Sequence, residues 1–141
     1  QDLGMYSNEK LKDVLENTTI LFGNHYEIER ICDNLEVDIQ GLREIGPDIV
    51  VKTCGANGSE IYSNDDKIAI DAIKTTAIDP TGAGDSFRAG FLTRFINGES
   101  ILESAKFAST VSSFIVEEQG CQTKAPSFDE AYERMTEFYK N

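Results

Sequence analysis

Apolar residues along the chain follow two patterns, short runs typical of strands and a three-to-four-residue repeat typical of helices. The short apolar and β-branched runs predict strands at residues 18–22, 49–53, 60–63 and 67–73. The helical repeat predicts helices at residues 9–16, 27–35, 39–45, 83–98, 101–115 and 128–139. Because strands alternate with helices, we expect a three-layer α/β domain whose mainly parallel sheet is covered by helices on both faces.

The helix predicted at residues 83–98 has the clearest apolar repeat. Phe87, Phe91 and Phe95 recur every four residues, with Leu92 and Ile96 beside them, which indicates one buried helical face. In the next helix Leu102 is expected to face inward with most of the other apolar residues. Both helices are therefore expected to bury an apolar face.

Composition limits the classes of partner. The chain has 141 residues, 40% of them hydrophobic, which suits one compact domain spanning residues 1–141. Its net charge of −12 would repel nucleic acid and anionic membranes. Its three cysteines, Cys32, Cys54 and Cys121, lack the paired spacing of a zinc site or disulfide framework, and no apolar run is long enough to span a bilayer. We therefore expect a cytoplasmic protein with a small-molecule partner.

The chemistry is concentrated at residues 79–85, Asp-Pro-Thr-Gly-Ala-Gly-Asp. A strand is predicted to end here, Gly82 and Gly84 let the backbone approach a ligand, and the amide groups that open the next helix are unpaired. Those donors and the helix dipole favour an anion such as a phosphate. A carboxylate would repel that anion, so Asp85 is better explained as a catalytic base, the alternative being a simple helix cap.

Two common phosphate-binding motifs are excluded at this turn. A Walker loop requires Gly-Lys followed by Ser or Thr, whereas Asp85 follows Gly84 here. A dinucleotide-binding fingerprint requires a third glycine where Phe87 stands. The turn therefore belongs to another class.

Residues 79–91, DPTGAGDSFRAGF, closely resemble the second signature of the ribokinase/PfkB family of carbohydrate and nucleoside kinases. The resemblance implies that the backbone of Gly82, Ala83 and Gly84 forms an anion hole. It also implies that Asp85 deprotonates the acceptor hydroxyl that attacks the γ-phosphate of ATP, and it places Thr81 among the nucleotide-binding residues.

Two further segments resemble family motifs in the same order along the chain. Asn24-x-x-Glu27 resembles the motif that organises Mg²⁺ and phosphate through a carboxylate and ordered water, although the same residues are common helix caps. Residues 53–58 resemble a Thr-x-Gly-x-x-Gly turn that contacts the nucleotide, which implies this role for Thr53, Gly55 and Gly58, although the segment is also an ordinary hairpin turn.

Further along the chain, the resemblance concerns the adenine of the nucleotide and a second ion. Ala108 and Ser109 match positions that contact adenine, although the family often has Asn at the second, and simple core packing is a strong alternative explanation for both residues. Asp79 and the loop after Val116 resemble a site for a monovalent cation such as K⁺. Lys124 stands where a serine ligand is expected, which leaves potassium dependence open.

The resemblance covers only the C-terminal half of the family. It implies a chain that holds the nucleotide-binding end and the catalytic base but lacks most of the acceptor pocket and the small β-sheet lid, which often forms a homodimer interface. The expected activity is ATP- and Mg²⁺-dependent phosphorylation of a sugar or nucleoside hydroxyl. Pro80, Arg88 and residues 120–123 look similar to archaeal nucleoside kinases and adenosine-kinase-like members.

The sequence allows two alternatives to a complete enzyme. The chain alone could bind nucleotide without turnover, because catalysis also requires an acceptor held in line. A degenerate kinase fold that acts as a scaffold is disfavoured, since Asp85, Asn24 and Glu27 are all intact.

Overall fold

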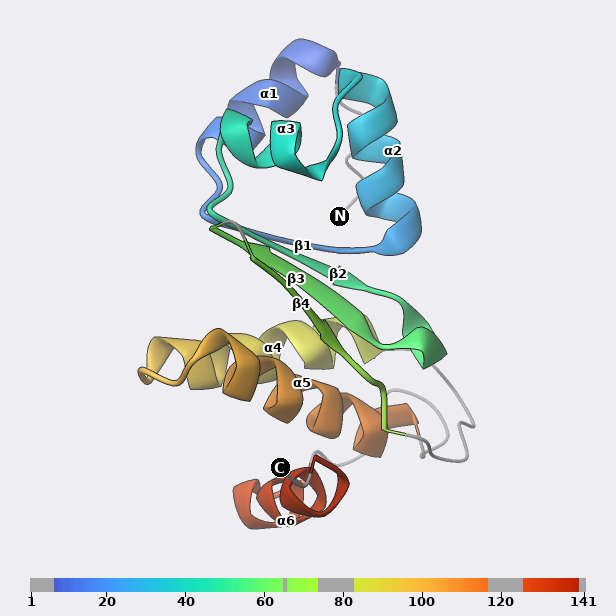
Figure 1. Cartoon of the computed structure of the whole chain (residues 1–141), viewed down its shortest axis with the longest axis vertical. Helices are drawn as coiled ribbons and strands as arrows, with labels where there is room; N and C mark the ends of the chain where they lie inside the picture. Colours follow the sequence, from blue (N-terminus) through green and yellow to red (C-terminus); the bar gives the residue numbers. More distant parts are fainter. Residues whose placement is uncertain (1–6, 65, 74–82, 117–125, 140–141) are drawn as a thin grey trace. The chain divides into compact units, whose positions relative to one another are not determined.

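The computed structural model describes residues 7–64, 66–73, 83–116 and 126–139 (Figure 1). Its described elements agree with the predicted ones except for shifts at their ends. In chain order they are α1 (Asn8–Glu16), β1 (Ile20–Asn24), α2 (His25–Leu35), α3 (Ile39–Ile45), β2 (Ile49–Thr53), the 3₁₀ turn η2 (Gly55–Asn57), β3 (Ser59–Ser63), β4 (Asp66–Ile70), α4 (Ala83–Ile96), α5 (Ile101–Val116) and α6 (Phe128–Phe138). The strand predicted at 67–73 ends earlier, at Ile70.

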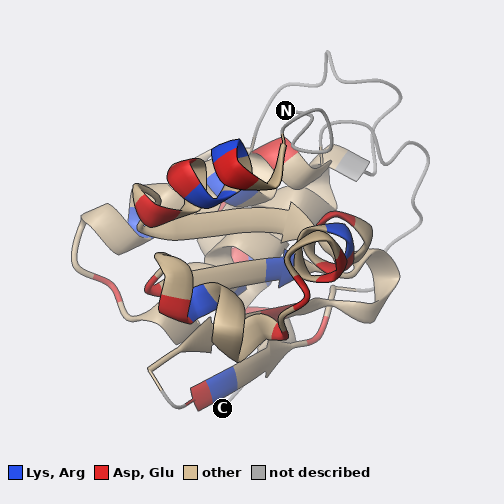
Figure 2. Cartoon of the chain, turned by 90° about the horizontal axis from the view of Figure 1, so that it is seen from above, with Lys and Arg blue, Asp and Glu red and all other residues tan. Residues whose placement is uncertain are grey.

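The chain divides into two compact units. The first consists of Gln1–Cys54 and Glu60–Ala69, and the second of Gly55–Ser59 and Ile70–Asn141. Acidic side chains are spread over many elements rather than gathered in one segment (Figure 2).

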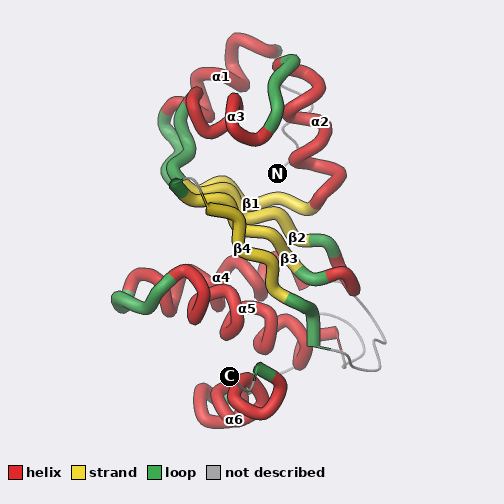
Figure 3. Tube along the Cα trace, in the orientation of Figure 1, coloured by secondary structure: helices red, strands yellow, loops and turns green. Residues whose placement is uncertain are grey.

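The four strands form one sheet in the order β1-β2-β3-β4 (Figure 3). β1 and β2 are parallel, with Ile20 opposite Ile49 and Asn24 opposite Thr53. β2, β3 and β4 follow one another through connections too short for a parallel crossover, so this part of the sheet is a meander. The described sheet is therefore mixed, whereas the sequence predicted a mainly parallel one. The parallel pair brings the carboxyl ends of β1 and β2 to the same edge.

The core of the first unit lies between its helices and the sheet. Leu21 of β1 and Val50 of β2 contribute to it, and Tyr62 of β3 packs against it. Each fully buried aliphatic side chain contributes about 1.5–3 kcal/mol relative to an exposed one. The other buried members come from the three helices and are Leu11, Leu15, Ile28, Ile31 and Leu42.

The second unit contains α4, α5 and α6. α4 and α5 pack closely, since a Cβ at Gly90 would lie 3.1 Å from the Cα of Ala108. α5 also packs on α6, where Phe107 forms a cluster with Ala131 and Met135. Ser127 and Glu130 form a reciprocal capping box that begins α6.

Two predicted core positions are wrong. Phe87 and Phe91 are buried, but Ile96 is 77% exposed and Leu102 is 39% exposed. An α-helix turns about 100° per residue, so Ile96, nine positions after Phe87, points to the opposite side of α4. Leu102 lies in the first turn of α5, six positions before the buried Ala108, and points about 120° away from it.

Candidate functional site

Asn24 and Glu27 are held together at the start of α2. Asn24 Oδ1 accepts a hydrogen bond from the Glu27 amide at 2.9 Å, and Glu27 Oε1 accepts one from the Asn24 amide at 2.9 Å. This reciprocal capping box satisfies two amide groups that would otherwise lack partners. The Asn-x-x-Glu motif predicted to organise Mg²⁺ and phosphate thus also caps a helix. The cap uses one of the two Glu27 carboxylate oxygens.

Thr53 lies opposite Asn24 in the parallel pair, at the end of β2. Ligands of open α/β sheets bind outside the carboxyl ends of parallel strands, because the strands end there and their loops diverge. Register therefore brings together two candidate residues from separate motifs. Both belong to the first unit.

The turn after Thr53 requires glycine for backbone reasons. Gly55 has φ 57° and Gly58 has φ 92°, and the Gly58 amide donates to the Gly55 carbonyl at 3.0 Å. A Cβ at Gly58 would lie 2.0 Å from the carbonyl oxygen of Ile70, whereas a Cβ at Gly55 would meet nothing within 4 Å. Glycine is thus required at position 58 both by the positive φ and by the lack of space for a Cβ. At position 55 only the positive φ favours glycine.

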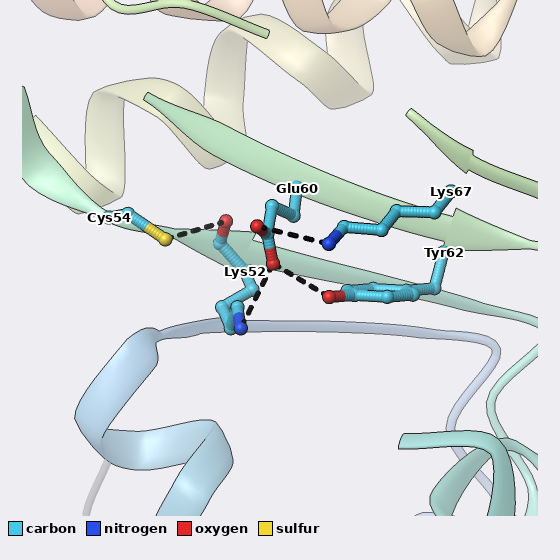
Figure 4. A network of polar contacts seen from close by, with 5 residues as sticks. All are labelled: Lys52, Cys54, Glu60, Tyr62 and Lys67. Atoms are coloured by element: carbon cyan, nitrogen blue, oxygen red, sulfur yellow. Dashed lines mark hydrogen bonds and ion pairs between the residues drawn. The ribbon is translucent and has the colours of Figure 1, made fainter. Parts of the chain in front are cut away.

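A charged network links the strands on either side of this turn (Figure 4). Glu60 of β3 accepts a hydrogen bond from Tyr62 at 2.6 Å and forms ion pairs with Lys52 of β2 at 3.0 Å and Lys67 of β4 at 3.4 Å. The hydrogen bonds from Tyr62 and Lys52 lower the pKa of Glu60 to about 2. Burial and the bond to Glu60 raise the pKa of Tyr62.

Sequence reasoning missed this network. Glu60 and Tyr62 are two positions apart on β3, so they share one face of the sheet, and cross-strand neighbours on that face can pair with them. The two-residue spacing of Glu60 and Tyr62 was the only signal in the sequence. Finding their partners also requires the strand order, which comes from the fold. Cys54, beside the network, has a raised pKa because of burial and the charge of Glu60, so it stays a protonated thiol at neutral pH.

The start of α4 carries the described part of the glycine-rich signature. Ala83, Gly84 and Asp85 occupy its first turn, and Asp85 is exposed. The Ala83 carbonyl accepts hydrogen bonds from Ser86 Oγ at 3.0 Å and Ser112 Oγ at 2.9 Å. Of the other candidates in this region, Asp79, Thr81 and Gly82 lie outside the described residues, as do Pro80, Lys124 and residues 120–123.

Ala108 and Ser109, the two candidate adenine contacts, are buried in α5. Ala108 packs against Gly90, as described above, and Ser109 Oγ is 2.9 Å from the Tyr139 hydroxyl. Tyr139 also donates to the carbonyl oxygen of Asp71 at 2.6 Å, and burial raises its pKa. Core packing is thus observed for both residues, and their contact with adenine stays a prediction.

The candidate residues fall into two groups that follow the two units. Asn24, Glu27 and Thr53 belong to the first unit, and the second contains the remaining described candidates, which are Gly55, Gly58, Ala83, Gly84, Asp85, Ala108 and Ser109. Among the described residues no three His, Cys, Asp or Glu side chains gather closely enough to hold a metal ion. None of the described helices is both long and apolar enough to cross a bilayer.

Comparison with known proteins identifies the family. The model of the pfkB family of carbohydrate kinases matches residues 4–127. The chain belongs to this family. One relative is a nucleoside kinase of Methanothermobacter thermautotrophicus, which is 56% identical over 136 residues, 96% of this chain and 44% of that protein. This pfkB family chain thus spans less than half the length of that curated relative.

Solved structures support the same assignment. Methanocaldococcus jannaschii nucleoside kinase, described as an archaeal member of the ribokinase family, superposes with a TM-score of 0.92 at 42% identity, over 97% of this chain and 46% of that one. Burkholderia thailandensis nucleoside kinase in complex with ADP-inosine gives a TM-score of 0.94 at 27% identity, over 100% and 44% of the two chains. The predicted ribokinase-like α/β fold is confirmed, as part of the full-length fold.

Proposed function

We propose that this pfkB family chain carries the nucleotide-binding end and the catalytic base of an ATP-dependent kinase whose acceptor is a nucleoside or sugar hydroxyl. The observation that carries the proposal is the glycine-rich signature, which leads into the first turn of α4 and puts Asp85 there, in a chain 56% identical to a nucleoside kinase. Residue roles within the signature are part of this proposal.

Asp85 acts as the general base in this scheme. Its carboxylate accepts the proton of the acceptor hydroxyl, the acceptor oxygen attacks the γ-phosphorus of ATP, and the bond to the β-phosphate oxygen breaks to release ADP. The amide groups of Gly82, Ala83 and Gly84, with the dipole of α4, stabilise the negative charge on the transferring group. Asp85 is exposed, which leaves its carboxylate accessible to an acceptor.

Mg²⁺ bound with ATP would neutralise charge on the phosphates. Glu27 suits an indirect role, because Mg²⁺ prefers oxygen ligands and keeps several of its waters. The capping box uses Glu27 Oε1 and no hydrogen bond to Oε2 is found among the described residues, so Oε2 is suited to a water of the metal shell. Asn24 would hold Glu27 in place through the cap. A K⁺ site at Asp79 remains a separate proposal.

Other contacts to ATP come from Thr53, Gly55 and Gly58 at the phosphates and ribose, from Thr81 within the signature, and from Ala108 and Ser109 near adenine. A nucleoside is the favoured acceptor class. Support comes from relatives that are named nucleoside kinases and from the Burkholderia thailandensis neighbour, whose structure contains ADP-inosine. We place the enzyme in the cytoplasm and its dimer contact, where one exists, in the lid of the family.

A second candidate function is nucleotide binding without turnover. It is favoured by length, because the chain spans 44% of its archaeal relative, and transfer needs an acceptor positioned for in-line attack. We expect the 141-residue chain alone to bind Mg·ATP weakly and to phosphorylate nothing at a useful rate.

The test uses two proteins. The isolated chain is titrated with Mg·ATP by calorimetry, and a chimera is assayed in which this chain replaces the matching 136 residues of the Methanothermobacter thermautotrophicus relative. We expect binding by the first and phosphorylation of inosine or adenosine by the second. A chimera that folds and binds ATP but phosphorylates neither nucleosides nor sugars would contradict the proposed activity.

A further inference from the structure

Ser112 of α5 reaches across to the first residue of α4. Its hydroxyl donates to the carbonyl oxygen of Ala83 at an Oγ–O distance of 2.9 Å. The same carbonyl accepts a second hydrogen bond at 3.0 Å from Ser86 Oγ, which lies on its own helix. Hydroxyl groups on two different helices therefore hold one carbonyl oxygen at the glycine-rich signature.

Close packing of α4 and α5 makes this contact possible. A Cβ at Gly90 would lie 3.1 Å from the Cα of Ala108 and 3.6 Å from the side chain of Val111, so the backbones of α4 and α5 are in close contact here. Serine has one of the shortest polar side chains, and it reaches a backbone atom of a neighbouring helix only when the two backbones are close. Ser112 directly follows Val111 in this contact region.

The bond at Ala83 sets the direction of the next amide group. The carbonyl of Ala83 and the N–H of Gly84 belong to one planar trans peptide unit, so they point in opposite directions. A restraint on the carbonyl therefore also restrains the N–H. Gly84 lies in the first turn of α4, where amide groups have no partner within the helix, and a Cβ there would meet nothing within 4 Å.

We propose that Ser112 is a positioning residue for phosphoryl transfer, which orients the Gly84 N–H toward the transferring phosphate by holding the Ala83 carbonyl. The inference rests on the proposed function, because it requires an anion at the start of α4. Ser112 lies outside the signature and outside the positions expected to contact adenine, so it adds a residue of α5 to the proposed site.

The experiment follows the Gly84 amide resonance in ¹H–¹⁵N spectra of the 141-residue chain during titration with inorganic tripolyphosphate and Mg²⁺. In the unsubstituted chain, tripolyphosphate should shift this resonance. Ser112→Ala should move the Gly84 resonance before any ligand is added and weaken tripolyphosphate binding about fivefold, the equivalent of one hydrogen bond between neutral groups. Ser112→Thr keeps the hydroxyl and should restore binding.

Ser113→Ala is the matched control. Its hydroxyl donates to the Thr110 carbonyl at 2.6 Å and accepts from Arg134 at 3.0 Å, so the same substitution one position along α5 removes bonds that do not involve Ala83. It should leave the Gly84 resonance and the tripolyphosphate affinity unchanged. If Ser112→Ala does not fold, Ser112→Cys is used, since a thiol is a weaker donor of similar size and should give the same direction of change.

The outcomes distinguish a failure of the Ser112 role from a failure of the proposed nucleotide site. If the unsubstituted chain binds tripolyphosphate but Ser112→Ala behaves like Ser113→Ala, Ser112 has no positioning role and the proposed function stands. If the unsubstituted chain binds neither tripolyphosphate nor Mg·ATP, the proposed nucleotide site itself is wrong and the role of Ser112 fails with it.

Discussion

Asn24 and Thr53 are register partners at the carboxyl ends of β1 and β2. Asn24 begins α2 through its capping box, and Thr53 leads into the turn that contains Gly55 and Gly58. Parallel pairing therefore places the starts of two candidate nucleotide-binding segments next to each other. A one-residue slip of either strand would also turn its core residue, Leu21 or Val50, away from the core, so core packing protects the arrangement.

Asp85→Asn tests the catalytic base. In the active chimera we expect kcat to fall at least about 100-fold, because an amide cannot accept the hydroxyl proton. ATP affinity should change little, since Asp85 is not proposed to contact the nucleotide. Steady-state kinetics with ATP titration measure both. Asp129→Asn, at an equally exposed first-turn position of α6, is the control and should leave kcat unchanged. Turnover within a few-fold of normal for Asp85→Asn would exclude its role as base.

Glu27→Gln separates capping from Mg²⁺ binding. Glutamine can still accept the Asn24 amide in a capping box, so the free energy of unfolding should change by less than about 0.5 kcal/mol. Loss of the carboxylate should weaken Mg²⁺-dependent ATP binding by the isolated chain, and calorimetry with and without Mg²⁺ measures this effect. Glu130→Gln makes the same change in the capping box of α6 and should leave Mg²⁺-dependent ATP binding unchanged. Equal ATP affinity in the two variants would leave Glu27 with only its structural role.

Gly58→Ala should destabilise the protein strongly. Alanine at φ 92° is strained, and its Cβ would lie 2.0 Å from the Ile70 carbonyl oxygen, so we expect a loss of more than about 2 kcal/mol. Gly55→Ala has only the backbone strain and should cost about 1–2 kcal/mol. Urea unfolding of both variants gives the comparison. A smaller loss for Gly58→Ala than for Gly55→Ala would contradict the packing explanation.

Glu60 should make stability depend on acid pH. Its folded pKa, about 2, is below its ordinary value of 4.5, so the native state favours the ionised form. The resulting stabilisation is present above pH 4.5 and is lost as the pH falls through 4.5 toward 2. Urea midpoints between pH 6 and pH 2 should therefore fall less steeply for Glu60→Gln than for the unsubstituted chain. Glu44→Gln, an exposed change outside the network, should keep the full slope.

Local features were the most predictable part of the fold. Ser7, Asn24 and Ser127 begin helices through bonds to residues three positions away, so the signal lies within a few residues of sequence. The family motifs were recognisable for a related reason, because a phosphate turn needs glycines and a base at fixed short spacing. The error at Ile96 came from placing it on the face of the phenylalanine repeat, although it lies one position beyond Phe95 and a helix turns about 100° per residue.

The amino-acid sequence by itself determined the elements, the kinase family and the identity of the candidate base. Three relationships depended on the tertiary structure: the register between Asn24 and Thr53, the cluster around Glu60, and the bond from Ser112 to Ala83. The first is set by backbone pairing and the last ends on a backbone carbonyl, which every residue type provides. The partners of Glu60 lie on three strands whose order only the folded sheet defines. Such contacts depend on how separate strands and helices come together in space, and residue spacing alone does not encode those distances.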